Sequence, residues 1–384
     1  MNQRVEFVLR AIRCENFRQL CQEYGVSAKT GYKWRERFLE RGLEGLEDLS
    51  RRPQQSGGLE EWVICEIVRL KQRHPHWGPR KLRVIYQRMR GQAPSESSFK
   101  RVLDRSGLTQ KRRVRQRQSV GRLHSARKAS ASNEVWTVDF KGWWYGAEGR
   151  RCEPLTVRDE FSRYVLEVRG LADSRTETVR ACFERLFNVY GLPGAIRSDN
   201  GSPFASVRAV MGLSRLSAWW LVLGIDLERG RPGCPQDNGG HERLHLDLSR
   251  ELEAGKLGER QVVLDEWRKT FNEERPHEAL GMRCPKEVYE RSERRYEGTP
   301  ADVDYGSMER RKVFATGHIR WGGQPIFIST ALQGWSVGLE PSGDGKWNVW
   351  FGRLLLGQME EATCSFKAAT EEVSQEIGEK QEVV

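Results

Sequence analysis

The sequence has no long hydrophobic run and no paired cysteines. No apolar stretch reaches the roughly 20 residues that span a bilayer, and the start, MNQRVEFVLRAIRCENF, has no continuous hydrophobic signal core. The eight cysteines occur singly, without a CxxC pair or a Cys/His spacing suited to zinc. We therefore expect an intracellular protein in a reducing compartment, with no membrane segment and no structural zinc.

Positive charge is concentrated in the first third of the chain. Residues 1–130 hold 30 Lys and Arg against 13 Asp and Glu, a net charge of +17, whereas the remaining residues carry −6. Such an excess is typical of a segment that binds a polyanion, because Lys and Arg neutralise phosphates. A solvated surface rich in arginine is the alternative. The length of 384 residues leaves room for roughly two to four domains.

The N-terminal region has the pattern of a helical DNA-binding unit. Residues 15–41 predict two helices around a tight turn at Gly25, with Ser27 as the N-cap of the second helix. This pattern is typical of a helix-turn-helix domain, here over residues 1–50, whose second helix enters the major groove. A plain helical hairpin is the alternative. The outer face of the second helix would carry the DNA contacts Lys29, Thr30, Lys33 and Arg37.

A second helical unit and a basic linker follow. Residues 59–108 predict three helices, which form either a second DNA-binding domain or a structural bundle. Residues 109–130 carry eight basic residues and no acid, so this linker cannot bury a core and should become ordered on a phosphate backbone. In isolation it would also fit a nuclear-localisation signal. The DNA contacts expected here are Arg80, Lys81, Lys100, Arg101, Lys111, Arg112, Arg113, Arg115 and Arg117.

From residue 134 the pattern changes to strands followed by helices, which indicates an α/β domain over residues 131–290. EPLTVRDE and RYVLEVRGL predict a strand pair joined at 160–163, and a capping box from Ser174 to Glu177 opens the next helix. After residue 302, glycine turns at 322–323 and 343–345 predict the hairpins of a small β-barrel over residues 302–361. The fold class we expect is multidomain, with N-terminal all-α units, a central α/β core and a C-terminal β-barrel.

Three acidic residues stand in separate motifs of the α/β region. Asp139 ends a predicted strand in WTVDFKG, Asp199 follows another in RSDNGSPF, and Glu242 lies early in a predicted helix in PQDNGGHERLH. If the two strands are neighbours, both aspartates emerge at one sheet edge, within reach of Glu242. Such oxygen ligands favour Mg²⁺ or Mn²⁺ over zinc, and two ions roughly 3.5–4 Å apart support phosphodiester chemistry. Asp159, at a predicted hairpin turn, is a competing ligand with a structural alternative.

Five motifs resemble the integrase core of insertion-sequence transposases, in the DDE superfamily that includes retroviral integrases. They are WTVDFKG, RSDNGSPF, GLSRLSAWW, RPGCPQDNGGHERLH and FNEERPHEALGMRCPKEVY, all within residues 134–290. The resemblance implies that the core has an RNase H-like fold. It also implies that Asp139, Asp199 and Glu242 are the catalytic and metal-binding triad, with Mg²⁺ as the cofactor and Mn²⁺ as a substitute.

The sequence departs from the family pattern at two places. The 42 residues between Asp199 and Glu242 exceed the spacing of many relatives, and the excess coincides with SVRAVMGLSRLSAWW, where we expect an added surface helix. Ser249 stands where relatives often have a DNA-facing Lys or Arg, with Arg250 beside it as the candidate contact.

Several neighbours of the triad are weaker candidates. Lys141 and Arg243 either contact phosphate or are solvated charges, and His245 either touches DNA or the metal water or packs against the core. In FNEERPH we expect Asn272 and Arg275 to cap the chain rather than to contact DNA.

These expectations converge on a DNA transposase. Residues 1–130 would bind the terminal inverted repeats of a mobile element in double-stranded DNA. The triad would free a 3′-OH and direct it at target DNA, without a covalent protein–DNA intermediate. Cutting two ends in register predicts a homo-oligomer on DNA, in a bacterial cytoplasm. The alternatives are a transposase-derived regulator with a silent core and a nuclease for RNA–DNA hybrids, against which the helix-turn-helix units weigh.

Overall fold

The chain divides into two compact units, Met1–Val63 and Ile64–Val384. The computed structural model describes residues 3–48, 58–109, 128–142, 144–145, 151–171, 173–206, 209–230, 239–252 and 261–369. Within these ranges, no helix combines the length and the apolar character that a membrane span needs. Five predicted DNA contacts of the basic linker lie outside the described residues, namely Lys111, Arg112, Arg113, Arg115 and Arg117.

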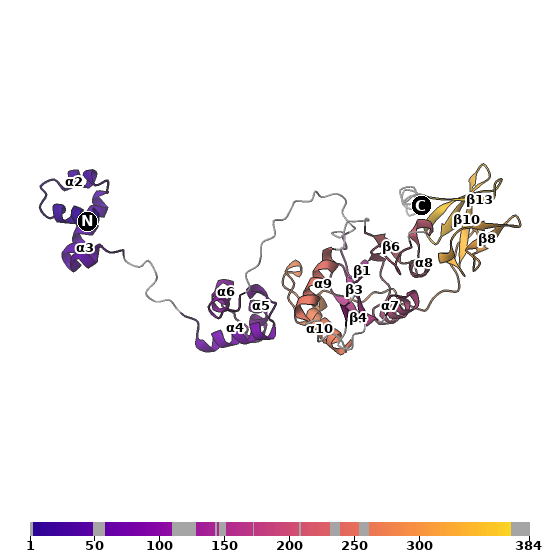
Figure 1. Cartoon of the computed structure of the whole chain (residues 1–384), viewed down its shortest axis with the longest axis horizontal. Coiled ribbons are helices and arrows are strands. Elements are labelled where there is room, and N and C mark those ends of the chain that lie inside the picture. Colours follow the sequence, from indigo (N-terminus) through magenta and orange to yellow (C-terminus); the bar gives the residue numbers. More distant parts are fainter. Residues whose placement is uncertain are drawn as a thin grey trace. The chain divides into compact units, whose positions relative to one another are not determined.

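Helices α1 to α3 form the first unit (Figure 1). They span Gln3–Ala11, Phe17–Glu23 and Ala28–Arg41, and the 3-10 helix η1 follows at Gly42–Leu46. Ser27 caps α3, since its hydroxyl accepts a hydrogen bond from the Thr30 amide at 3.2 Å. Gly25 takes the left-handed conformation of the turn, with φ of +64°. The two predicted helices are confirmed, and α1 adds a third that the sequence pattern left unassigned.

The helices α4 to α6 form a bundle. They span Glu61–Arg73, Pro79–Arg90 and Glu96–Arg105, all within the predicted region 59–108. Tyr86 of α5 and Phe99 of α6 are buried, and their rings meet edge to face at 5.7 Å. Ser95 caps α6 through the amide of Ser98. The three predicted helices are therefore confirmed.

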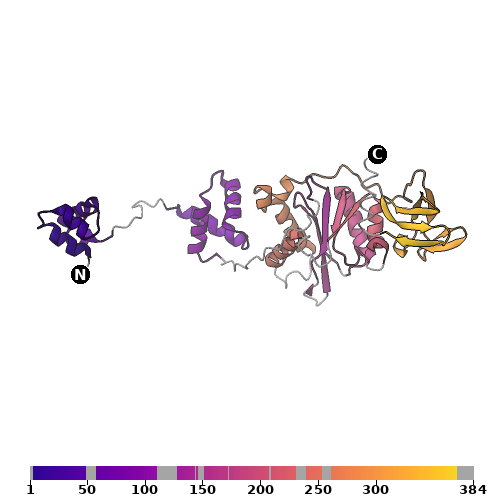
Figure 2. The same cartoon turned by 90° about the horizontal axis from the view of Figure 1, so that it is seen from above.

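A six-stranded sheet forms the α/β core (Figure 2). Its strands are β1 Val135–Phe140, β2 Trp144–Tyr145, β3 Arg151–Asp159, β4 Val165–Leu171, β5 Ala195–Ser198 and β6 Asp226–Arg229. Strand β1 lies between antiparallel β3 and parallel β5, and β6 extends the parallel side. Strands β2 and β4 both pair antiparallel with β3, so the predicted β3–β4 hairpin is confirmed.

Helices cover both faces of this sheet. On one face lie α7, Thr176–Tyr190, and α8, Arg215–Val222, against a buried apolar layer that includes Trp136, Val138 and Ile196. On the other face lie α9, Gly239–Glu251, and α10, Gln261–Glu273, whose Leu244 and Phe271 share an apolar cluster with β4. Because side chains alternate along a strand, Asp139 points away from Trp136 and Val138, toward the α9 face.

The predicted capping box at the start of α7 is wrong. The N-cap is Arg175, and it makes no side-chain capping bond. Asp173 takes this role instead, because its Oδ1 accepts hydrogen bonds from the Arg175 amide at 3.1 Å and the Thr178 hydroxyl at 2.8 Å. The Asp173 side chain, two residues before the N-cap, therefore takes the place of the expected Ser174 to Glu177 capping box.

The added helix α8 is buried, contrary to our expectation of a surface helix. Trp219 and Trp220 are 1% and 0% exposed and pack in the core beside α7. On its other side, Leu213 and Ala218 belong to the apolar cluster of the C-terminal domain. Apart from the exposed Arg215, α8 is apolar on both of these sides, so it packs against the core and the C-terminal domain together.

The C-terminal domain contains an open sheet rather than the predicted closed barrel. Its strands run in the order β13-β12-β11-β10-β7, and β8 pairs with β9 separately. Within the described chain, the edge strands β7 and β13 do not pair with each other. The β8–β9 hairpin buries Ile319 and Ile326 in one cluster with Val337 and Phe351 of the sheet. The hairpin therefore packs against the sheet through apolar side chains, and the strands do not close into a barrel.

The two predicted glycine hairpins of this domain are confirmed, between β8 and β9 and between β10 and β11. The bounds are β7 Glu309–Lys312, β8 His318–Trp321, β9 Gln324–Phe327, β10 Ser336–Gly343, β11 Lys346–Phe351, β12 Leu354–Glu360 and β13 Ser365–Ala368.

Candidate active site

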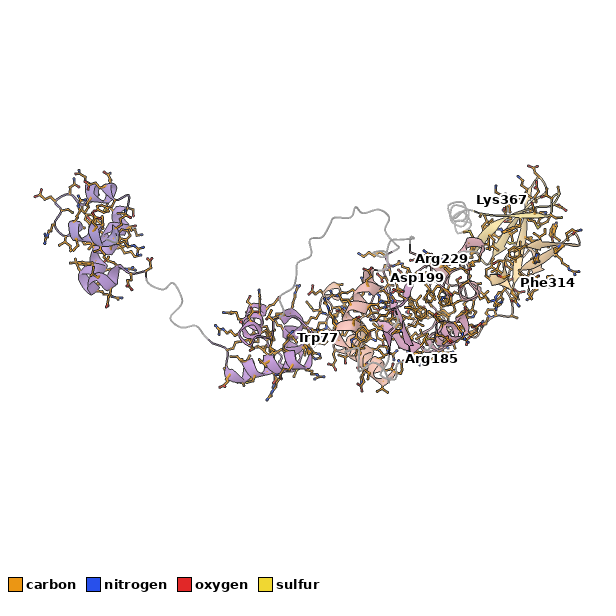
Figure 3. The ribbon with its side chains drawn as sticks, viewed as in Figure 1. Trp77, Arg185, Asp199, Arg229, Phe314 and Lys367 are labelled. Atoms are coloured by element: carbon orange, nitrogen blue, oxygen red, sulfur yellow. The ribbon has the colours of Figure 1, made fainter. Side chains whose placement is uncertain are left out.

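Strands β1 and β5 bring Asp139 and Asp199 to the same edge of the sheet. Their parallel register pairs Thr137 with Arg197, and continuing it by two residues sets Asp139 opposite Asp199. Figure 3 labels Asp199 in the α/β core. The condition on which the sequence prediction depended, that these strands are neighbours, is confirmed.

A tight turn orients the Asp199 carboxylate. The Gly201 amide donates a hydrogen bond to Asp199 Oδ1 at 3.2 Å, and a Cβ on residue 201 would lie 2.9 Å from Oδ2. The side-chain amide of Asn200 donates to the carbonyl of Gly230 at 2.7 Å, which ties this turn to the end of β6. The segment Asp199–Asn200–Gly201 therefore holds the carboxylate through backbone geometry that a larger residue at 201 would disturb.

Glu242 lies in the first turn of α9 and is exposed. One turn later, His245 Nε2 lies 2.8 Å from Thr156 Oγ1, and Nδ1 lies 3.9 Å from Asp139 Oδ2. Burial, the largest cause, and the nearby cations Lys141 and Arg158 together lower the pKa of His245 to about 4. His245 is therefore neutral at pH 7, and its ring reaches from α9 to Thr156 of β3, the residue paired with Asp139 in the sheet.

The electrostatics of Asp139 reflect a gathering of negative charge. Burial, the largest cause, and the carboxylates of Asp199 and Glu242 together raise the pKa of Asp139 to about 7. The three acids therefore interact, although no group of three or more His, Cys, Asp or Glu in the described ranges is arranged as a ready metal site.

Asp159, the competing acid, has a structural role. It is fully buried, and its carboxylate accepts hydrogen bonds from the amides of Asn133 and Ser162, each at 2.7 Å. These bonds close the β3–β4 turn on the side of the sheet where β1 begins. Asp237, also in the Glu242 motif, lies outside the described residues.

The other candidates near the triad differ in exposure. Arg243 is paired with Asp247 one turn along α9, Nε to Oδ2 3.4 Å, and Arg250 is exposed in the last turn of that helix. Lys141 follows β1, and burial lowers its pKa.

The candidate DNA contacts of the first unit lie on α3. Lys29 and Lys33 are exposed, and Arg37 is half-buried. Thr30 is engaged in the helix cap, with its hydroxyl 2.9 Å from that of Ser27. The two lysines are therefore the most accessible of the four.

The candidate contacts on α5 and α6 face different surroundings. Arg80 lies near two carboxylates, 3.7 Å from Glu278 and 3.9 Å from Glu96. Burial lowers the pKa of Lys81 to about 8, with the cation of Arg275 adding to the effect. Lys100 and Arg101 are exposed on α6, so they are the more accessible pair.

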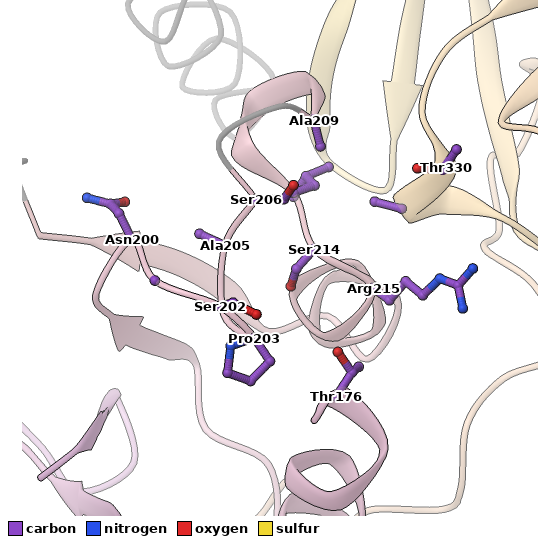
Figure 4. Close-up of a pocket in the computed structure, with 13 residues that line it drawn as sticks. Thr176, Asn200, Ser202, Pro203, Ala205, Ser206, Ala209, Ser214, Arg215 and Thr330 are labelled. Carbon is purple, nitrogen blue, oxygen red and sulfur yellow. The ribbon is translucent and has the colours of Figure 1, made fainter. Parts of the chain in front are cut away.

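A pocket of about 480 Å³ opens beside the Asp199 turn (Figure 4). It lies between the starts of α7 and α8 and the C-terminal domain, and sequence patterns gave no sign of it. No acidic residue is among the described residues that line it. Its polar lining consists of hydroxyl, amide and guanidinium groups, which come from Thr176, Asn200, Ser202, Ser206, Ser214, Arg215 and Thr330.

Comparison with known families covers both the helical region and the α/β core. Residues 129–235 and 223–285 each match an integrase core domain. The α/β region of the chain therefore contains an integrase core domain. Residues 3–54 of this integrase-type chain match a helix-turn-helix domain, and residues 30–103 match a homeodomain-like domain. The helix-turn-helix and integrase domains together indicate that it binds DNA.

Two sequence relatives come from bacterial insertion elements. One is an uncharacterized 31.7 kDa protein of insertion element IS407 from Burkholderia multivorans, 27% identical over 59% of this chain and 80% of the relative. The other is an uncharacterized 39.2 kDa protein of insertion element IS476 from Xanthomonas euvesicatoria, 28% identical over 58% of this chain. The match spans 63% of the length of this second relative.

Solved structures overlap with the chain loosely. The catalytic core domain of BIV integrase is 24% identical over 41% of this chain and 93% of that chain, with a TM-score of 0.32. A simian T-cell lymphotropic virus intasome in complex with PP2A regulatory subunit B56 gamma is 14% identical over 72% of this chain and 93% of that chain, with a TM-score of 0.38. These scores are too low to add to the assignment.

Proposed function

We propose that the chain is a DNA transposase that cuts and joins phosphodiester bonds at a centre formed by Asp139, Asp199 and Glu242. One observation carries the proposal. Within an integrase core domain, the register of β1 and β5 sets Asp139 opposite Asp199, and Glu242 on α9 is close enough to raise the pKa of Asp139.

The chemistry of the three side chains fits a divalent cation. Carboxylates supply oxygen donors, which Mg²⁺ and Mn²⁺ prefer. A cation among them would offset the mutual repulsion that raises the pKa of Asp139. Asp139, Asp199 and Glu242 would hold it, with the exposed Glu242 side chain adjusting most. When bound, such ions supply the Lewis acidity that promotes attack at phosphorus.

The residues around the acids have supporting roles in this proposal. The turn at Gly201 keeps the Asp199 carboxylate pointed at the sheet edge. His245 stays neutral, so it does not compete as a cation for the acids. The acid-free pocket beside the Asp199 turn suits the sugar-phosphate backbone of a DNA strand, because Ser202 and Arg215 offer hydroxyl and guanidinium donors.

The helical units would hold the element's terminal repeats. Lys29 and Lys33 on α3 and Lys100 and Arg101 on α6 are exposed, and such cations bind phosphate or base edges. The net charge of +17 over residues 1–130 supports the same role. Because two element ends must be cut in register, at least two copies of the chain would assemble on DNA.

A nicking assay tests the proposed function. The protein is incubated with a labelled duplex that carries its element's terminal repeat, with and without Mg²⁺. We expect Mg²⁺-dependent nicking by the unmodified protein and at least about a hundredfold less by Asp139→Asn, Asp199→Asn and Glu242→Gln.

Asp226→Asn is the matched control, because it neutralises an exposed acid on the adjacent strand β6. It should nick like the unmodified protein. DNA binding without cleavage by every protein would contradict the proposal and favour a regulator with a silent core.

A further inference from the structure

The C-terminal half of α9 is held by one buried arginine. Arg275 follows α10 and is 3% exposed. Its guanidinium contacts two acids one turn apart on α9, Asp247 Oδ2 at 2.7 Å and Glu251 Oε1 at 2.7 Å. Glu251 also accepts a hydrogen bond from Trp267 Nε1 at 2.9 Å. This end of α9 is therefore fixed to the α10 segment by a buried, charge-assisted network.

The N-terminal end of α9 is held by a second buried arginine. Arg158 of β3 is 5% exposed, and its Nη1 donates a hydrogen bond to the carbonyl of Gly240 at 3.1 Å. Its Nε donates to Thr137 Oγ1 at 3.2 Å, and Glu160 pairs with its other nitrogen. A Cβ on residue 240 would lie 1.8 Å from this guanidinium, so any larger residue there would displace Arg158 from its contact.

These two contacts enclose the turn of α9 that carries Glu242. A guanidinium is a rigid fork, so it fixes the direction of its partners as well as their distance, which a lysine ammonium cannot do. Removing a buried cation also leaves its acids uncompensated. Sliding or rotating α9 would therefore break a buried contact at one end or the other.

We propose that Arg158 and Arg275 are positioning residues that clamp α9 and so set the Glu242 carboxylate relative to Asp139 and Asp199. The inference rests on the proposed function, since it presumes that the three acids bind one divalent centre. It goes beyond that function because it assigns Arg158 and Arg275 a role in orienting a metal ligand. Neither contact with DNA nor capping of a helix would give them that role.

Replacing a buried arginine can also destabilise the fold, so the test needs a variant that loses stability without releasing α9. Arg268 on α10 is the matched control, because its guanidinium binds the Leu166 carbonyl on β4 and pairs with Asp265 on α10 itself, 3.5 Å away. It is partly buried and charged like the clamp residues, yet none of these contacts reaches α9. Arg268→Lys should lower the melting temperature without affecting the acids.

Mn²⁺ binding to the full chain, followed by electron paramagnetic resonance of the free ion, tests the clamp without relying on activity. We expect Arg275→Lys and Arg158→Lys to bind Mn²⁺ about tenfold more weakly than the unmodified protein, because residues that orient metal ligands contribute on this scale. Glu251→Gln, which keeps the hydrogen-bonding shape, provides a milder second variant. Amide hydrogen exchange should rise along α9 in the clamp variants.

The outcomes separate the clamp from the proposed function. Weakened Mn²⁺ binding in the clamp variants, with unchanged binding in Arg268→Lys, would support the clamp. Unchanged binding in folded Arg275→Lys, Arg158→Lys and Glu251→Gln would overturn it, provided that Asp199→Asn still abolishes binding. If the unmodified protein bound no Mn²⁺ at all, the proposed function would fail and the clamp with it.

Discussion

At the scale of single residues, the candidate centre is built on the polar side of a sheet whose other side is apolar. Trp136 and Val138 of β1 are buried against α7 and α8, whereas Asp139 alternates to the α9 side. The cost of this placement is visible in Asp139, whose pKa is raised to about 7 by burial and, to a lesser extent, by the neighbouring acids. A carboxylate in such surroundings gains most from a cation partner.

The pH dependence of stability tests the state of Asp139. The folded pKa of about 7 exceeds the usual value of 3.8, so the folded chain retains this proton more strongly than the unfolded chain. The associated stability is fully present below pH 3.8 and is lost as pH rises through about 7. Asp139→Asn cannot ionise and should escape that loss.

Urea unfolding in the presence of EDTA gives the measurement. The free energy of unfolding of Asp139→Asn should exceed that of the unmodified protein by about 1–3 kcal/mol at pH 8 and by less at pH 5. A difference that stays constant between these pH values would show that Asp139 does not titrate in this range.

At the scale of elements, features set by local signals could be predicted from the sequence, whereas features set by long-range packing could not. The Ser27 cap, the helices α4 to α6 and the glycine hairpins depend on residues a few positions apart, and all are confirmed. The burial of α8 and the open C-terminal sheet depend on contacts between segments that lie far apart in the sequence. Periodicity within one segment carries no information about them.

The candidate site follows the same division. The placement of Asp139 and Asp199 at one edge could be predicted, because strands that end in acids are visible in sequence. The Arg158 contact could not, because its partner Gly240 lies 82 positions away. The Arg275 network was also missed, since a buried arginine resembles a surface one until its acids are located.

The packing of α3 gives a prediction at this scale. Gly31 lies where a Cβ would come within 2.7 Å of Cys21 Sγ and 2.9 Å of Phe7 Cζ. Gly31→Ala should destabilise helices α1 to α3 by about 1–3 kcal/mol through overpacking, despite the better helix propensity of alanine. Hydrogen exchange of these helices in the full chain measures the effect.

Glu36→Ala, at an exposed position of the same helix, is its control and should change exchange little. Slower exchange in Gly31→Ala than in the unmodified protein would contradict the close packing at this crossing.

At the scale of the whole molecule, charge and chemistry are separated along the chain. The basic first third carries the helix-turn-helix domains, and the mildly acidic remainder carries the integrase core and its three acids. Such a division lets one part hold a polyanion while the other concentrates negative charge where a cation would bind. It also makes the assembly of the three acids, from β1, β5 and α9, the central claim of the proposal.

Iron-directed cleavage tests that claim most directly. Fe²⁺ in place of Mg²⁺, with ascorbate, generates radicals that cut the polypeptide near the bound ion, and mass spectrometry locates the cuts. We predict cuts close to Asp139, Asp199 and Glu242 together, which excess Mg²⁺ suppresses and Asp199→Asn abolishes. Cuts that are absent from these three segments, or that persist in Asp199→Asn, would contradict the proposal that the three acids form one metal centre.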